Sequence, residues 1–172
     1  MTRNLHKMML DELRDIYSAE TQITKALPKM ARKASSQELK SAFEHHLEET
    51  RGHIERLDKV FEMLDTNARA RGKKCEAMEG LVSEAKEIME EDLDADAMDA
   101  ALVGAAQKVE HYEIAGYGTL CAWAKAMGHE DVAKTLAETL EEERAADEKL
   151  NKLSAKINQA AARKAHGEAR AA

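Results

Sequence analysis

The chain has 172 residues, of which 44% are hydrophobic, only 3% are aromatic and one is proline. This composition is typical of long helices and argues against a sheet-based fold, so we expect a single all-α domain. The formal net charge of -7 argues against broad binding to nucleic acid or to an anionic membrane, since either would require a basic surface.

Two long helices and one short helix are expected in the first half of the chain. Hydrophobic residues recur with helical periodicity from residue 5 to about 34, where Pro28 should kink the helix, and again from about 37 to 65. The polar, glycine-containing stretch DTNARARGKKCEAMEG predicts a long crossover that leads into a short helix at about 77–91.

Two further long helices complete the pattern. One follows the acidic segment EEDLDADA and stops at Gly128, and the other runs from about 130 to 159. Short connections within two helix pairs and one long connection between the pairs indicate a ferritin-like four-helix bundle, although composition alone would permit other bundles. We expect this bundle, with its short fifth helix in the crossover, to occupy residues 1–160, and the alanine-rich segment 161–172 to form a flexible tail.

The chain shows no sign of a membrane or secreted protein. No segment approaches the roughly 20 consecutive apolar residues of a membrane span, and the N-terminal stretch has no apolar run of signal length. Cys75 and Cys121 lack the paired spacing of a disulfide framework or a thiolate zinc site. We therefore expect a cytoplasmic protein.

Polar residues interrupt the apolar stripe of every long helix near its middle. In steps of three and four residues, the stripe of the first helix carries Glu20 between Ile16 and Ile23. The other interruptions are His46, Glu49 and His53 in the second helix, Glu110 and Glu113 in the third, and Glu143 and Asp147 in the fourth. Four inward-facing breaks at one level of a bundle need a common explanation.

Metal ions explain these buried acids best. Ionised carboxylates are costly to bury without cations, and the stripes offer no lysine or arginine at this level. The five candidate ligands are Glu20, Glu49, Glu110, Glu113 and Glu143. Their five negative charges are nearly balanced by two divalent ions, and bridging carboxylates can hold such ions about 3.5–4 Å apart. We predict two iron ions, with manganese or a mixed pair as alternatives, because carboxylate-rich sites with some imidazole suit these metals.

The remaining polar residues have less defined roles. His53 and Asp147 are candidates either for metal binding or for holding a ligand in place. His46 lies a turn before Glu49, and His111 points about 100° away from Glu110; both are assigned to structural or ligand-supporting roles.

Two further assignments follow from the phase of the helices. In the run EEE that ends at Glu143, Glu143 shares the phase of Leu140, so Glu142 is assigned to a solvated face. Tyr117 lies one turn after Glu113, where its phenol could hydrogen-bond a ligand, although core packing is the commoner role of such a tyrosine.

Five segments of the chain carry a resemblance to the YciF-type family of bacterial ferritin-like stress proteins. They are DELRDIYSAETQITKALPKMA, HLEETRGHIERL, KKCEAMEGL, AAQKVEHYEIAGYGTL and TLEEERAADEKL, and together they span about residues 5–155. The resemblance implies a four-helix ferritin-like fold, a di-metal carboxylate centre and a homodimer. Glu110 and Glu113 are also similar to the paired glutamates on the third helix of rubrerythrins.

The sequence departs from the Glu-x-x-His motif of the wider ferritin superfamily. Gly52 stands three residues after Glu49, and Ala146 stands three residues after Glu143. Ferroxidase or peroxidase activity therefore does not carry over directly from the resemblance.

The leading hypothesis is a di-iron protein that binds Fe(II) and reacts with dioxygen or peroxide in stress defence. The alternative is a non-enzymatic, metal-stabilised dimeric bundle.

Overall fold

The computed structural model describes residues 4–66 and 73–171, with side chains as far as Lys164. These residues form five α-helices and no strand, which confirms the predicted all-α fold. The helices are α1 (Leu5–Lys33), α2 (Gln37–Met63), α3 (Glu76–Glu90), α4 (Ala95–Ala126) and α5 (Glu130–Ala171). Among the described residues, no helix is both long enough and apolar enough to cross a membrane.

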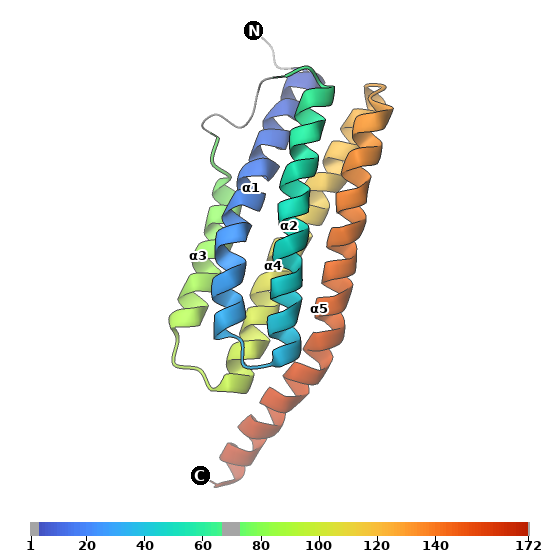
Figure 1. Cartoon of the computed structure of the whole chain (residues 1–172). Coiled ribbons are helices and arrows are strands. Elements are labelled where there is room, and N and C mark those ends of the chain that lie inside the picture. The colour runs from blue at the N-terminus through green and yellow to red at the C-terminus, as the bar shows by residue number, and fades with distance from the viewer. Residues whose placement is uncertain (1–3, 67–72, 172) are drawn as a thin grey trace.

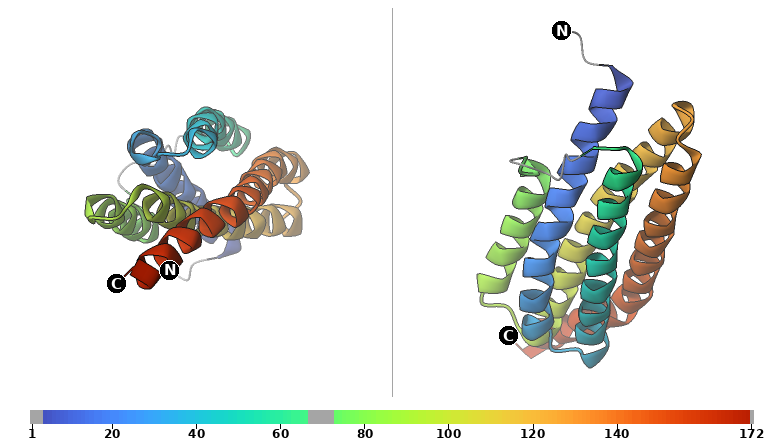
Figure 2. Two further views of the ribbon diagram at one scale, coloured as in Figure 1. Left: turned by 90° about the horizontal axis from the view of Figure 1, so that it is seen from below. Right: turned by 45° about the horizontal axis from the view of Figure 1, so that its top comes forward.

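The four long helices form two hairpins that pack side by side (Figure 1). α1 packs mainly on α2, and α4 packs mainly on α5. The α4–α5 turn contains Gly128, whose φ of +77° favours glycine because it has no Cβ. The long crossover between the hairpins carries α3, which contacts α1 and α4 from outside the four long helices (Figure 2). This is the expected ferritin-like topology.

α1 continues through Pro28 without ending, which agrees with the single helix predicted from residue 5 to about 34. The kink expected at this proline stays a prediction. α1 ends at Lys33, and the backbone N–H of Ala34 still donates to the carbonyl of Met30.

A buried carboxylate from α4 holds the turn between α1 and α2. Asp99 accepts hydrogen bonds from the backbone N–H groups of Ser35 at 2.8 Å and Ser36 at 2.7 Å. The Ser36 hydroxyl in turn caps α2 by accepting from the N–H of Leu39. The turn is thereby tied to the second hairpin, which helps to set the height at which α2 faces α4.

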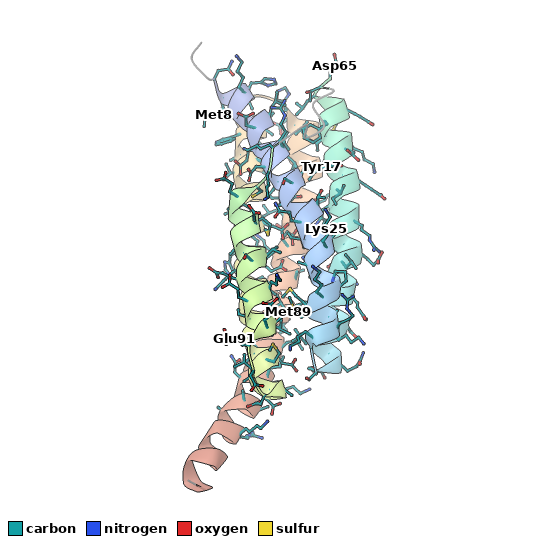
Figure 3. All side chains as sticks on the ribbon, turned by 90° about the vertical axis from the view of Figure 1, so that its left-hand side faces the viewer. Met8, Tyr17, Lys25, Asp65, Met89 and Glu91 are labelled. Atoms are coloured by element: carbon teal, nitrogen blue, oxygen red, sulfur yellow. The ribbon has the colours of Figure 1, made fainter. Side chains whose placement is uncertain are left out.

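α5 runs well beyond its predicted end near residue 159, as far as Ala171. The alanine-rich segment lacks an apolar face, but its alanine, arginine and lysine residues have high helix propensities, which favours continuation of the helix. The end of α5 projects past the other helices (Figures 1 and 3). Lys164 Nζ lies 3.2 Å from Oδ1 of Asp94, the N-cap of α4. The flexibility of residues 161–172 stays a prediction.

Two apolar clusters fill the bundle and leave a polar layer between them. The cluster nearer the α1–α2 turn includes Ile23, Leu27, Phe43, Leu102 and Leu150. The cluster towards the α4–α5 turn includes Leu13, Ile16, Leu57, Leu120 and Leu136. Each long helix crosses from one cluster to the other, and the residues at the crossing are the polar interruptions of its apolar stripe.

Candidate metal centre

Three of the long helices place glutamates in the polar layer. Glu20 lies on the buried face of α1 between Ile16 and Ile23, so the periodicity that buries these isoleucines also buries its carboxylate. α4 contributes Glu110 and Glu113, and α5 contributes Glu143. All four glutamates are at most 2% exposed.

α2 supplies imidazoles to the same layer. His46 and His53 are 6% and 0% exposed and lie seven residues apart, which puts them about two turns apart on one face of the helix. Phe43 and Leu57 of the two apolar clusters lie on either side of them along the chain.

The buried side chains form two groups that share one carboxylate. The first group is His46, Glu110, Glu113 and Glu143, and the second is Glu20, His53 and Glu143. Within each group, one ligand atom per residue lies within 4.8 Å of all the others.

The two oxygens of Glu143 face different groups. Oε1 lies 3.0 Å from Nδ1 of His53, whereas Oε2 lies 3.8 Å from Nε2 of His46. The His53 Nδ1 atom is also 3.4 Å from Oε1 of Glu20, and the His46 Nε2 atom is 3.2 Å from Oε1 of Glu110. A carboxylate that bridges two metal ions requires this kind of arrangement.

Many buried polar atoms of the layer have no hydrogen-bond partner in the described part of the chain. They are Oε2 of Glu20, both ring nitrogens of His46, Nδ1 of His53, Oε2 of Glu110, and both carboxylate oxygens of Glu113 and Glu143. Buried polar groups are normally paired, so a cluster of this size calls for a ligand. The four glutamates carry four negative charges when ionised, which two divalent cations would neutralise. Their oxygens, together with two imidazoles, fit iron or manganese.

Burial raises the pKa values of three of the buried acids. Loss of hydration is the main cause for Glu110, Glu113 and Glu143, and neighbouring carboxylates raise these pKa values further. Burial also opposes the charged form of His53, but the carboxylates of Glu143 and Glu20, which lie 3.0 and 3.4 Å from its Nδ1 atom, outweigh this effect and raise the His53 pKa to about 10. Without metal, the layer therefore retains protons that a cation would displace.

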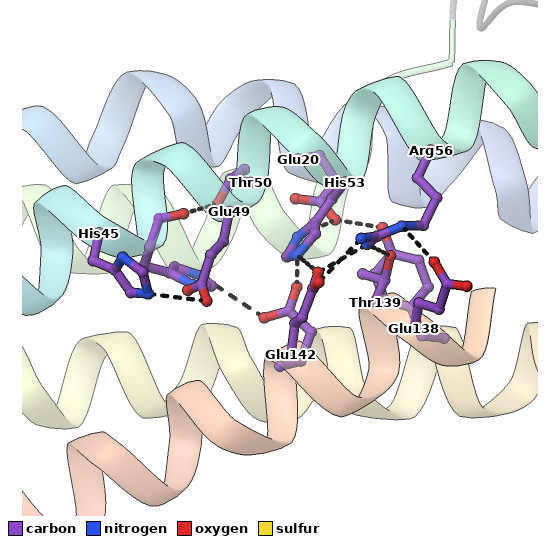
Figure 4. Close-up of polar contacts among 12 residues, drawn as sticks. Glu20, His45, Glu49, Thr50, His53, Arg56, Glu138, Thr139 and Glu142 are labelled. Atoms are coloured by element: carbon purple, nitrogen blue, oxygen red, sulfur yellow. Dashed lines mark hydrogen bonds and ion pairs between the residues drawn. The ribbon is translucent and has the colours of Figure 1, made fainter. Parts of the chain in front are cut away.

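A salt bridge at the edge of the layer orients His53 (Figure 4). The Nε2 atom of His53 lies 2.9 Å from Oε2 of Glu142, and Arg56 donates to both oxygens of Glu142 at 2.8 and 3.0 Å. Arg56 also donates to the Thr139 hydroxyl at 2.7 Å. Because an ionised carboxylate only accepts hydrogen bonds, Nε2 carries the proton. In the neutral imidazole, Nδ1 then offers its lone pair towards Glu20 and Glu143.

A buried phenol holds the carboxylate of Glu20. The Tyr117 hydroxyl donates to Oε1 of Glu20, and Tyr117 is 0% exposed. Burial, followed by the charge of Glu20, raises the Tyr117 pKa well above its usual value, so the phenol keeps the proton that it donates. Two roles for Tyr117 were considered from the sequence, hydrogen bonding to a ligand and packing in the core. In the structure Tyr117 is buried in the core, and its hydroxyl also hydrogen-bonds a candidate ligand.

Five of the residues that the sequence analysis singled out lie together in the layer, namely Glu20, His53, Glu110, Glu113 and Glu143. Metal binding by these residues stays a prediction. It assigned His46 to a structural or supporting role, whereas the structure includes His46 in the first group. The seven-residue spacing between His46 and His53, which puts both on one face of α2, was the sequence signal for this inward position. Glu142 was assigned to a solvated face, but it is only 38% exposed and pairs with His53 and Arg56.

Two predicted ligands lie outside both groups. The Glu49 side chain is 26% exposed, and its oxygens lie 3.2 Å from Nε2 of His45 and 3.5 Å from Nδ1 of His46. Asp147 instead accepts from Asn151 at 3.1 Å and lies 3.4 Å from Nε2 of the exposed His111. Metal binding by Glu49 and by Asp147 stays a prediction.

Comparisons with known proteins agree with this architecture. Residues 4–163 match a family model described as a domain of unknown function, DUF892. Protein YciF of Escherichia coli K12 is 50% identical over 152 residues, which cover 88% of this chain and 91% of that protein. The resemblance noted in the sequence is therefore confirmed.

Solved structures extend the comparison to the fold. The crystal structure of the Escherichia coli stress protein YciF matches with a TM-score of 0.88 and 48% identity, covering 92% of this chain and 99% of that chain. YcfI of Rhodopseudomonas palustris, which has been proposed to be a structural protein, matches with a TM-score of 0.83 and 50% identity, covering 87% of this chain and 94% of that chain. A protein of Xanthomonas campestris with 24% identity shares the fold, with a TM-score of 0.76 and coverage of 95% and 99%. The chain belongs to the DUF892 family.

Proposed function

We propose that this protein is a di-metal carboxylate protein of the ferritin-like class, with two iron ions as its cofactor, that handles dioxygen or peroxide in a stress response. The observation that carries the proposal is the pair of buried ligand groups that share Glu143, most of whose polar atoms have no hydrogen-bond partner among the residues that the structure describes. Manganese, or a mixed pair, suits the same oxygen and nitrogen donors. When bound, the metal pair would supply redox chemistry.

Each residue of the layer has a distinct role in this proposal. Glu143 would serve both positions. Glu20 and His53 would hold one ion, and His46, Glu110 and Glu113 would hold the other. Tyr117 orients Glu20 and presents an O–H group beside it. The apolar clusters on both sides of the layer limit the access of water.

The relatives support two candidate functions. The Escherichia coli relative is described as a stress protein, which agrees with a protective role. The Rhodopseudomonas palustris relative has been proposed to be a structural protein, which favours the second candidate, a metal-stabilised dimeric bundle without turnover. In that case the ions mainly neutralise the buried acids that α1, α4 and α5 place in the polar layer. A homodimer is part of both candidates.

Metal stoichiometry tests the proposal directly. Anaerobic addition of Fe(II), followed by desalting and elemental analysis, should give about two ions per chain. Replacing the shared carboxylate, Glu143→Ala, should abolish tight binding at both positions. Glu141→Ala is the matched control, because Glu141 lies on the same helix, is exposed and pairs with Arg144. Wild-type protein that remains metal-free under these conditions would refute the proposal.

Exposure of the Fe(II)-loaded protein to oxygen separates the two candidates. Growth of near-ultraviolet absorbance, absent from Glu143→Ala, is expected for a di-iron protein that reacts with oxygen. Fully loaded protein that shows no change with dioxygen or with peroxide would instead identify the metal as structural.

The salt bridge beside His53 provides a second variant series. Arg56→Ala frees Glu142, so His53 loses its fixed orientation, and we expect the affinity for Co(II) to fall by roughly 10- to 100-fold. Arg144→Ala is the control, because this arginine is exposed and pairs with Glu141 outside the layer. Anaerobic titration followed by visible absorbance measures both affinities. Equal affinities would show that the salt bridge does not support metal binding.

A further inference from the structure

A small cavity between α2 and α5 is lined both by exposed residues and by residues of the first ligand group. Its volume is about 20 Å³, room for about one water-sized particle. The exposed His45 and Lys149 line its outer part, and the buried His46 and Glu110 line its inner part. Glu49 lies between these two pairs of residues and is exposed to an intermediate degree.

The side chains in this cavity form a continuous series of metal-binding atoms. Nε2 of His45 lies 3.2 Å from Oε1 of Glu49, and Oε2 of Glu49 lies 3.5 Å from Nδ1 of His46. The other ring nitrogen of His46 lies 3.2 Å from Oε1 of Glu110. Both nitrogens of His46 are buried without a hydrogen-bond partner among the described residues. His46 therefore faces Glu49 through one nitrogen and the buried centre through the other.

A second cavity of about 20 Å³ reaches His46 and Glu110 from the opposite side. Its other lining residues are all apolar and include Ile23 and Leu27 of α1, Val82 of α3 and Val109 of α4. A cation on this path would lose its hydration without gaining ligands, which is costly. The cavity between α2 and α5 offers a carboxylate and imidazoles in place of that hydration.

We propose that Glu49, together with His45, receives divalent cations at the surface and passes them through His46 to the buried centre. The proposal rests on the function proposed above and assigns a separate role to Glu49. The proposal explains why Glu49, which belongs to the inward stripe of α2, lies at the mouth of the cavity. Glu49 is needed for the rate of loading and is not needed to hold the ions once they are bound.

Rapid mixing of the metal-free protein with Co(II) under anaerobic conditions, followed by visible absorbance, tests this role. Glu49→Gln keeps the shape of the side chain but removes its charge, so loading should slow by about tenfold or more. The final content should remain two ions per chain. Glu48→Gln is the matched control, because Glu48 is exposed and pairs with Arg51. It should load at the wild-type rate.

Two further variants test the path itself. Lys149→Gln removes a positive charge from the mouth and should speed loading by about two- to fivefold, the opposite sign to Glu49→Gln. Ala146→Leu places a larger side chain in the cavity lining and should slow loading, whereas Ala145→Leu, at the exposed neighbouring position, should not.

The outcomes distinguish this inference from the proposed function. If the wild type binds two ions and Glu49→Gln loads at the same rate, the cations use another path and the inference is wrong. If Glu49→Gln loses an ion at equilibrium, Glu49 is a permanent ligand and the inference is also wrong. If the wild type takes up no Co(II), the proposed function itself fails, and this inference fails with it.

Discussion

Anaerobic addition of Fe(II) or Mn(II) to the metal-free protein should raise its Tm by roughly 15–30 °C. A ligand that binds only the folded state stabilises it by about 4 kcal/mol when its free concentration is a thousand times Kd, so two such ions contribute about 8 kcal/mol. For a domain of this size, each kcal/mol corresponds to about 2–4 °C. The physical source is the replacement of unpaired buried atoms and retained protons by metal–ligand bonds.

Thermal unfolding followed by far-ultraviolet circular dichroism measures this shift. Glu143→Ala should show little response to metal, because it lacks the carboxylate common to both groups, whereas Glu141→Ala should respond like the wild type. The metal-free Glu143→Ala variant should remain folded, since the change removes a buried acid whose pKa is raised by burial. A Tm that does not respond to metal in the wild type would contradict the proposed centre.

The metal-free protein should lose stability as the pH rises from about 6.5 to 10. The His53 pKa is raised to about 10 in the folded state, so its contribution is fully present below the ordinary pKa of 6.5 and disappears as the pH passes through 10. The pKa values of Glu110, Glu113 and Glu143 are also raised. The folded state therefore binds more protons than the unfolded state. Deprotonation of these acids also lowers the free energy of unfolding as the pH rises.

The expected loss is on the order of a few kcal/mol, because each unit of pKa difference corresponds to about 1.4 kcal/mol. The opposite shifts of Glu49 and Glu142, whose pKa values are lowered, act below about pH 4.5 and outside this window. Urea unfolding of chelator-treated protein at several pH values measures the slope. His53→Gln should flatten it, and the same change at the exposed His111 should not.

The metal-loaded protein should behave differently over the same pH range. Metal binding displaces the retained protons, so metal affinity rises with pH and offsets the loss seen without metal. The stability curves of the two forms should therefore separate as the pH rises. Metal-free protein whose stability is constant or increases between pH 6.5 and 10 would show that the layer does not hold the protons inferred here.

The helical periodicity of the sequence was sufficient to identify most of the candidate site. Glu20, Glu110, Glu113 and Glu143 share the phase of nearby leucine and isoleucine residues, and a helix that buries those residues must turn the glutamates inward as well. His53 follows the same rule on α2. The two-hairpin topology could also be predicted from the sequence, because the connection lengths and Gly128 indicate which helices are neighbours.

Periodicity could not decide between His46 and Glu49. Three residues correspond to about 300° of rotation, so the two side chains lie only about 60° apart on α2, and either could face the centre. The packing of α2 against α1 and α5 places His46 opposite Glu110 of α4 and leaves Glu49 at the cavity mouth. Asp147 lies one turn beyond Glu143 and contacts Asn151 and His111 outside both groups.

The sequence by itself determined an all-α bundle and a layer of inward carboxylates, because both depend on the 3.6-residue period and on local helix signals. Only the tertiary structure decided how that layer divides into two groups around Glu143, and that Arg56 and Glu142 orient His53. These contacts join residues on different helices. They depend on the relative height and rotation of packed helices, which the periodicity of a single helix does not specify.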